Sequence, residues 1–207
     1  VVLERTHREI LGVSCIPLEE NPQSRQQIVR TRSFAVTCSD MDAILAAVSV
    51  HMAEAVNVLR KEGNAAKTVG VMFHTDPFKA NRRYHAVVEY RPLQHACADV
   101  ITLTQAAHDL VRAFFKEGYG YKKAGVMLAD LIPAEQSLVP TTLFDTDEIE
   151  VLKRRERIQA SIEALNEKFG GKVVTLASAK CSAEWAMRRD YLSPCPTTKW
   201  DDLLTVS

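Results

Sequence analysis

The chain has 207 residues, of which 46% are hydrophobic and 25% charged, and its 26 lysines and arginines balance 26 acids. This composition is typical of one or two compact soluble domains. No apolar run approaches the roughly 20 residues that a membrane span needs, and the N-terminus has no secretory pattern. Five scattered cysteines form no C-x-x-C pair, which disfavours disulfides and structural zinc and favours a cytoplasmic location.

The chain begins without a methionine, and we expect it to be a piece of a longer protein. Its first residues predict a short helix that ends at Gly12. The polar stretch 19–27 predicts a linker, and the β-branched residues within 28–34 predict the first strand. Ser39, with Asp42 three positions later, predicts the capped start of an amphipathic helix that runs to the next glycine.

Four further elements follow in the same part of the chain. Residues 67–73 and 84–90 predict a hairpin, residues 99–118 a second amphipathic helix, and residues 124–129 a fourth strand. The order strand, helix, strand, strand, helix, strand is that of the split βαβ plan. We therefore predict an α+β fold, with a four-stranded antiparallel sheet, both helices on one face and the other face open.

The remainder of the chain predicts a smaller unit. A loop over 136–147 leads to a helix from about residue 148 to residue 169, and residues 172–176 predict a short strand. An irregular tail rich in proline completes this small C-terminal α/β extension.

Basic residues gather on the strands and at their ends. Arg30 and Arg32 alternate with Thr31, so both guanidinium groups leave the same side of the sheet. Such residues suit the phosphates of a nucleic-acid backbone. An equally simple explanation is that they are solvated basic side chains, which protect the edge of the sheet from aggregation. Other basic residues on the strands and at strand ends include Arg82, Arg83, Lys122 and Lys123.

No catalytic machinery is visible in the sequence. The six histidines have no metal-binding spacing, and we interpret them as surface or boundary residues. The acids over 145–148 precede a helical pattern and are explained as capping residues. A glycine-rich phosphate loop and a nucleophile motif are both missing from the sequence.

Several blocks of sequence resemble the C-terminal half of UmuC-like Y-family DNA polymerases, the family that contains the catalytic subunit of DNA polymerase V. These blocks begin with the N-terminal Val-Val-Leu-Glu-Arg-Thr and end with Leu-Ser-Pro near the C-terminus. The most specific is Tyr-Lys-Lys-Ala-Gly-Val-Met-Leu over 121–128. The resemblance implies the end of a thumb (1–18), a linker (19–27), a little-finger DNA-binding domain (28–135), a connecting loop (136–147) and a C-terminal domain (148–207).

The implied function is error-prone translesion synthesis in SOS mutagenesis and DNA repair. By this resemblance the little finger holds the template-primer duplex, with Arg30, Arg32, Ser33, Lys122 and Lys123 against the DNA backbone. Arg82 and Arg83 are assigned to the same role. The parent chain would be a DNA-directed polymerase whose palm binds magnesium, whereas this fragment would lack the palm and carry no cofactor. A UmuD′-type dimer, RecA and the sliding clamp are the protein partners that the family implies.

A clamp-binding peptide is expected after the last little-finger strand. UmuC-like chains carry a Gln-Leu-x-Leu-Phe type motif there, and this chain has Pro-Thr-Thr-Leu-Phe over 140–144. Leu143 and Phe144 keep the apolar anchors, while the glutamine and the first leucine are missing. Clamp binding and local packing of these two side chains both remain open.

Two other functions stay open at this point. An RNA-binding RRM has the same order of strands and helices, but its third strand needs stacking aromatics, and residues 83–90 have them only at the ends. A protein-interaction domain that uses the open sheet is the second alternative.

Overall fold

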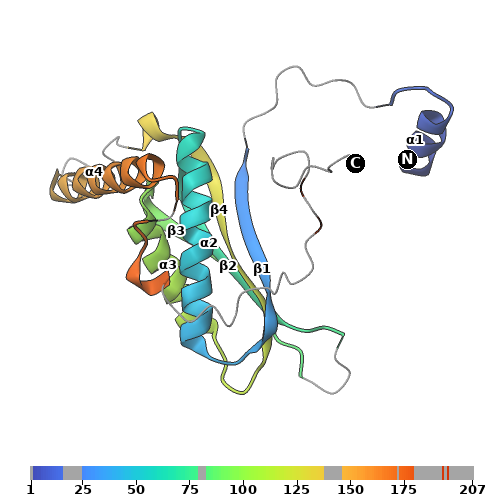
Figure 1. Ribbon diagram of the computed structural model, residues 1–207, viewed down its shortest axis with the longest axis horizontal. Helices are drawn as coiled ribbons and strands as arrows, with labels where there is room; N and C mark the ends of the chain where they lie inside the picture. The colour runs from blue at the N-terminus through green and yellow to red at the C-terminus, as the bar shows by residue number, and fades with distance from the viewer. Residues whose placement is uncertain are drawn as a thin grey trace, which may run out of the picture.

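The computed structural model describes residues 2–15, 25–78, 83–137, 146–171 and 173–179, together with two single residues of the tail. The main domain consists of strands β1 (Gln27–Cys38), β2 (Asn64–Thr75), β3 (Ala86–Cys97) and β4 (Tyr121–Pro133) and helices α2 (Met41–Lys61) and α3 (Val100–Phe114). The strands form one antiparallel sheet in the order β1-β4-β2-β3, and both helices pack on the same side (Figure 1). The predicted fold class and element order are confirmed.

Both helices of the main domain begin at an aspartate. Asp40 caps α2, and its carboxylate accepts hydrogen bonds from the backbone N–H groups of Asp42 and Ala43, both at 3.2 Å. The prediction of Ser39 as the cap is therefore wrong by one residue. Asp99 caps α3 in the same way. A carboxylate satisfies the free N–H groups of the first turn and also interacts favourably with the helix dipole.

The core lies between the two helices and the sheet. α2 contributes one buried stripe, and alternate residues of β2 and β4 pack against it from the sheet. Among the side chains that are fully buried are Ile44, Val48, Met52, Val56 and Leu59 of α2, Leu103 of α3, and Phe34, Val69, Val71, Phe73 and Leu128 of the sheet.

By length and composition alone α2 could span a membrane, although the sequence predicts no such segment. It has 21 residues, and its most apolar 18-residue window has a mean hydropathy of 1.4, with 61% of that window buried inside the fold. A helix that covers the middle of a sheet needs such a composition. Its apolar character is therefore accounted for by the core.

A further helix, α4 (Thr146–Lys168), lies beside the helix layer, and the 3-10 turn η2 (Ala177–Ala179) follows it (Figure 1). The Gln159 side chain accepts a hydrogen bond from the N–H of Val100 at 3.4 Å, and Glu163 forms an ion pair with Arg60 of α2. η2 contacts α2 through a hydrogen bond of 3.0 Å between the Ser49 and Ser178 hydroxyl groups.

The short strand expected over 172–176 is not found in its described part, 173–176. The side-chain amide of Asn166 takes the place of a neighbouring strand there. It donates to the carbonyl of Val174 at 3.1 Å and accepts from the N–H of Val174 at 2.8 Å. These backbone groups are thus satisfied without a ladder.

The N-terminal helix α1 (Val2–Ile10) forms as predicted and is followed by Gly12, which has φ +81°. All of its side chains are exposed. The assignment of this helix to a thumb stays a prediction.

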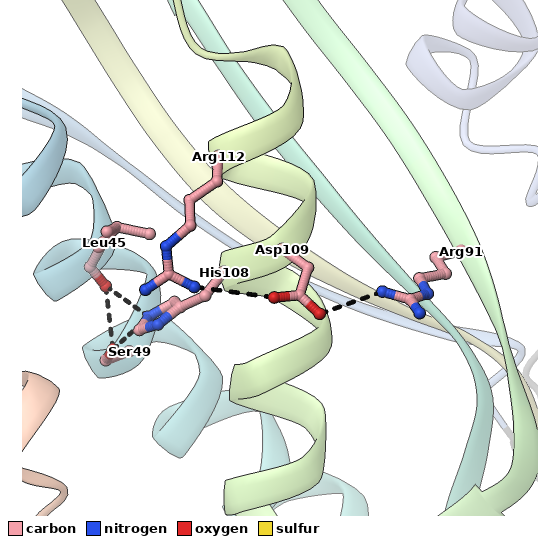
Figure 2. Close-up of polar contacts among 6 residues, drawn as sticks. All are labelled: Leu45, Ser49, Arg91, His108, Asp109 and Arg112. Atoms are coloured by element: carbon pink, nitrogen blue, oxygen red, sulfur yellow. Dashed lines mark hydrogen bonds and ion pairs between the residues drawn. The ribbon is translucent and has the colours of Figure 1, made fainter.

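A polar contact is buried between α2 and α3. Figure 2 shows that Nε2 of His108 points from α3 toward α2, where it lies 2.8 Å from the Ser49 hydroxyl and 3.1 Å from the carbonyl oxygen of Leu45. A carbonyl oxygen only accepts, so Nε2 carries the proton of a neutral ring. Burial lowers the pKa of His108, and the hydrogen bond to Leu45 opposes this effect.

Two strands approach closely at Gly125 of β4. A Cβ atom at this position would collide with the backbone carbonyl of Arg30 and with Thr31. We expect Gly125→Ala to lower the free energy of unfolding by about 1–3 kcal/mol because β1 must shift. Gly171→Ala is the control, since nothing lies within 4 Å of its Cβ. Urea unfolding measures both, and equal stability of the two variants would contradict the close approach.

The buried His108 also predicts a pH dependence of stability. Its pKa in the folded chain is below the ordinary value of 6.5, so the unfolded chain binds the proton more readily. This contribution is complete above about pH 6.5 and is lost as the pH falls. We expect His108→Gln to lose less stability than the wild type between pH 7.5 and 5.5 in urea unfolding. Burial lowers the pKa of His85 as well, so part of the wild-type loss should remain.

Candidate nucleic-acid interface

The register of the sheet decides which side chains face the helices. Ile28 of β1 lies opposite Leu128 of β4, Leu128 lies opposite Val69 of β2, and all three are buried. Directly opposed residues of an antiparallel ladder share a face, and alternate residues along a strand point to opposite faces. Residues in phase with Ile28 therefore face the helices, and residues in phase with Val29 face away from them.

We call the side away from the helices the open face. In the ladders of the described strands its one full positive charge is Lys123. The acid that the described contacts place on this face is Asp130, which accepts a hydrogen bond of 2.6 Å from the Thr68 hydroxyl at the end of β4 opposite to Lys123. The main residues of the open face are Val29, Thr31 and Ser33 of β1, Lys123, Gly125 and Met127 of β4, Gly70, Met72 and His74 of β2, and Ala86, Val88 and Tyr90 of β3.

Arg30 and Arg32 do not lie on the open face. They share one side of β1, as predicted, but Arg30 lies opposite Val126 and Arg32 opposite Ala124, two buried residues of the helix side. The open face is therefore not lined by these two arginines, and their assignment to the DNA backbone stays a prediction. Because β1 is an edge strand, their side chains project beside α2, where neither forms an ion pair with a described residue.

Arg91 of β3 lies on the helix side at the other edge of the sheet. It faces Asp109 of α3, and their ion pair is 3.2 Å long (Figure 2). Arg112 also approaches this carboxylate, at 3.7 Å. Two arginines thus share one acid in the helix layer.

The centre of the open face is flat and apolar. The ring of Tyr90 lies over Gly70, so that a Cβ at position 70 would meet the ring carbons at 2.7 and 2.8 Å. The hydroxyl group of Tyr90 donates to the sulfur of Met127 at 3.1 Å. Tyr90 is the only phenyl, phenol or indole ring on the open face of the described strands, and it is held against the sheet by these contacts.

Positive side chains gather at one end of the sheet, where β2 ends and β3 and β4 begin. This end is at the bottom of Figure 1. Lys123 lies there on the open face, between Ser33 and His74. Lys122 lies in a bulge and donates from Nζ to the carbonyl of Phe34 at 2.8 Å. Arg83 is exposed three residues before the start of β3.

A hydrogen-bonded cluster holds the loops at this end in place. The phenol oxygen of Tyr121 accepts from the backbone N–H of Lys116 at 3.1 Å and lies 3.1 Å from Nδ1 of His85. His85 in turn pairs through its backbone with Thr75 at the end of β2. Burial, and secondarily the charge of Lys116, lowers the pKa of His85. No sequence motif marks this cluster, because its members come from three separate segments.

Three of the predicted site residues lie outside the described residues: Arg82, Leu143 and Phe144. Within the described part of the chain, no group of three or more His, Cys, Asp or Glu side chains could hold a metal ion. Of the predicted DNA-binding residues, the structure brings together Ser33, Lys122, Lys123 and Arg83 at one end of the sheet and places Arg30 and Arg32 on the helix side.

Known proteins with similar sequences cover the whole chain. Protein ImpB of Salmonella typhimurium is 38% identical over 203 residues, which are 98% of this chain and 47% of that protein. Protein MucB of Escherichia coli is 36% identical over 97% of this chain and 46% of its own length. Protein UmuC of Salmonella typhimurium is 33% identical over 213 residues, 100% of this chain and 48% of its own. The chain spans about half the length of the curated relatives that it matches.

Among solved structures, a DinB family error-prone DNA polymerase from Sulfolobus solfataricus matches with a TM-score of 0.44 and 16% sequence identity. The match covers 61% of this chain and 35% of that polymerase. The fold assignment rests on the sheet order and register rather than on this likeness. Residues 156–206 match a family model described as a domain of unknown function. Residues 25–139, more than half of the chain, match the model of the impB/mucB/samB family C-terminal domain, and the chain belongs to this family.

Proposed function

We propose that this chain is the DNA-holding C-terminal part of an error-prone translesion DNA polymerase. The polymerase activity, a nucleotidyl transfer, and the magnesium that it uses belong in this proposal to a palm domain outside these 207 residues. Membership of the impB/mucB/samB family supports the assignment, and so does the resemblance to UmuC-like polymerases. The role of the present chain is to bind the template-primer duplex.

The open face carries the proposal. It has Lys123 at one end of the sheet, with Lys122 and Arg83 at the same end, and its described acid, Asp130, lies at the other end. A duplex repels carboxylates and attracts ammonium and guanidinium groups, and contacts to phosphates hold it without reading its sequence. We assign Ser33, Lys122, Lys123 and Arg83 to the DNA backbone.

Arg30 and Arg32 have a different place in this proposal. Their side chains lie at the outer edge of β1, on the helix side, and no described acid neutralises them. They suit a stretch of DNA backbone that passes along this edge of the sheet rather than across the open face. We therefore expect their contribution to be separable from that of Lys123.

The RNA-binding alternative finds little support on the open face. An RRM needs exposed aromatic rings on its central strands for bases to stack on. On the open face of the described ladders the one such ring is Tyr90, which lies over Gly70 and donates a hydrogen bond to the sulfur of Met127. Binding of a protein to the open face stays an outcome of the DNA-binding test.

The protein partners of the parent chain are proposed on family resemblance alone. They are a UmuD′-type dimer, RecA and the sliding clamp, the last through Leu143 and Phe144. These two residues lie outside the described part of the chain.

Lys123→Ala tests the DNA-binding proposal. We expect the chain to bind duplex DNA in a fluorescence anisotropy titration, with an affinity that falls linearly with salt on logarithmic scales. The variant should lose affinity about equally for all sequences, and its salt slope should be smaller by about 0.9.

Arg91→Ala is the charge-matched control, because Arg91 is paired with Asp109 on the other side of the sheet. It should leave the salt slope unchanged. Equal slopes for Lys123→Ala and the wild type would remove Lys123 from the interface. Preference for single strands or RNA would favour an RRM-like function, and no binding to any nucleic acid would favour a protein-interaction domain.

The clamp peptide has its own test. If Leu143 and Phe144 fill a pocket of the sliding clamp, the double variant Leu143→Ala/Phe144→Ala should recover much less clamp in a pull-down than the wild type does. The variant's melting temperature serves as the control for local packing. The same recovery with both proteins would exclude clamp binding through these residues.

A further inference from the structure

Three polar side chains form a row across the open face. Lys123 of β4 lies directly opposite Ser33 of β1 on one side and opposite His74 of β2 on the other. All three are partly exposed. Side chains that oppose each other directly in antiparallel strands have Cβ atoms about 4.5–5.5 Å apart. A hydroxyl, an ammonium and an imidazole group therefore stand side by side on three adjacent strands.

This row has the composition of an anion site. Lys123 supplies the charge, and the Ser33 hydroxyl can donate one further hydrogen bond. In the described ladders no acidic side chain stands in this row, and Asp130, which reaches the open face through Thr68, lies at the other end of β4. A phosphodiester group has one negative charge and two free oxygens, which neighbouring donors in such a row can bind together.

His74 adds a donor only when it is protonated. Its Nδ1 lies 2.8 Å from the carbonyl oxygen of Thr75, and since a carbonyl only accepts, Nδ1 carries a proton. In the neutral ring Nε2 is then a hydrogen-bond acceptor, which repels a phosphate oxygen. Protonation turns Nε2 into a charged donor. Histidine is the side chain that ordinarily makes this change between about pH 5 and 8.

Charged and titratable groups from several elements surround His74. Lys123 faces it from β4, and β3 presents the uncharged Ala86. Arg83 is exposed before β3, while His85 directs its ring toward Tyr121 and Tyr119. The nearest acid in sequence, Asp76, is half-buried and accepts a hydrogen bond from the N–H of Phe78. A bound phosphate would favour the protonated ring, because its negative charge attracts the positive imidazolium.

We propose that Ser33, Lys123 and His74 together form a phosphate site of the DNA interface whose affinity increases on proton uptake by His74. This proposal rests on the proposed function, since it takes the phosphate to be that of the duplex. Binding of the duplex then takes up a proton, and the affinity rises as the pH falls from 8 to 5.5. Lys123 binds the phosphate at every pH in this range, and His74 adds a further contact at acidic pH.

The test is an anisotropy titration of the whole chain with duplex DNA that carries a pH-insensitive rhodamine dye. Salt series are recorded at pH 8.0 and pH 5.5. In the wild type we expect an affinity about fivefold higher at pH 5.5 and a salt slope larger by about 0.9, as one more phosphate contact requires. His74→Gln should lose most of both differences. His74→Arg should bind at pH 8.0 at least as tightly as the wild type does at pH 5.5.

His7→Gln, on the exposed helix α1, is the matched control and should keep the pH dependence of the wild type. Melting curves at pH 5.5 confirm that each variant is folded. If the wild type and His74→Gln bind duplex DNA with the same pH dependence, the role of His74 is overturned while the proposed function stands. If the wild type does not bind duplex DNA at either pH, the proposed function fails and the phosphate site fails with it.

Discussion

The antiparallel register of β1 and β2 against β4 is the constraint on which the rest of the structure depends. Gly125 permits the close contact between β1 and β4, and the ladder from Gln27 to Ser33 continues without a shift. With this register, each position along the strands belongs either to the helix side or to the open face. A slip of β1 by one residue would place Arg30 on the open face instead of Thr31. Every other side chain of the strand would also change face.

The same register explains how a chain without net charge can keep the described acids away from the end of the open face that carries Lys123. Acids of the main domain and α4 are matched to arginines away from the open face: Glu62 to Arg25, Glu163 to Arg60 and Asp109 to Arg91. Each of these pairs contributes little to stability where it is exposed. Their larger effect is on the distribution of charge, because they hold these carboxylates away from Lys123 and its neighbours in the row.

The periodicity of the sequence predicted the elements well and the faces poorly. Residues 28–34 alternate in a way that groups Arg30 with Arg32, and this much is correct. Which side they face depends on Ile28 and Phe34, which share their phase and are buried, yet Val29 on the opposite phase is equally apolar in sequence. With apolar residues on both phases, only the pairing partners Val126 and Ala124 decide.

Other features could not be predicted because they join distant segments. The row of Ser33, Lys123 and His74 exists only through two ladders, and nothing in the local sequence of His74 distinguishes it from the remaining histidines. The expected strand over 172–176 fails for a related reason: a single side chain, Asn166, supplies both hydrogen bonds that a neighbouring strand would have supplied. Propensity describes a segment's own preference, and such a partner lies outside the segment.

The described contacts of α4 lie on the side of the sheet opposite to the open face. They reach Arg60 of α2, the first residues of α3 and, through η2, Ser49, all on the helix side of the sheet. Each hydrogen bond of this kind is worth about 0.5–1.5 kcal/mol net, so the segment is held by several modest contacts rather than by a large apolar interface. These contacts lie on the helix side of the sheet, opposite to the open face that carries Lys123, so the described part of the domain of unknown function leaves that face uncovered.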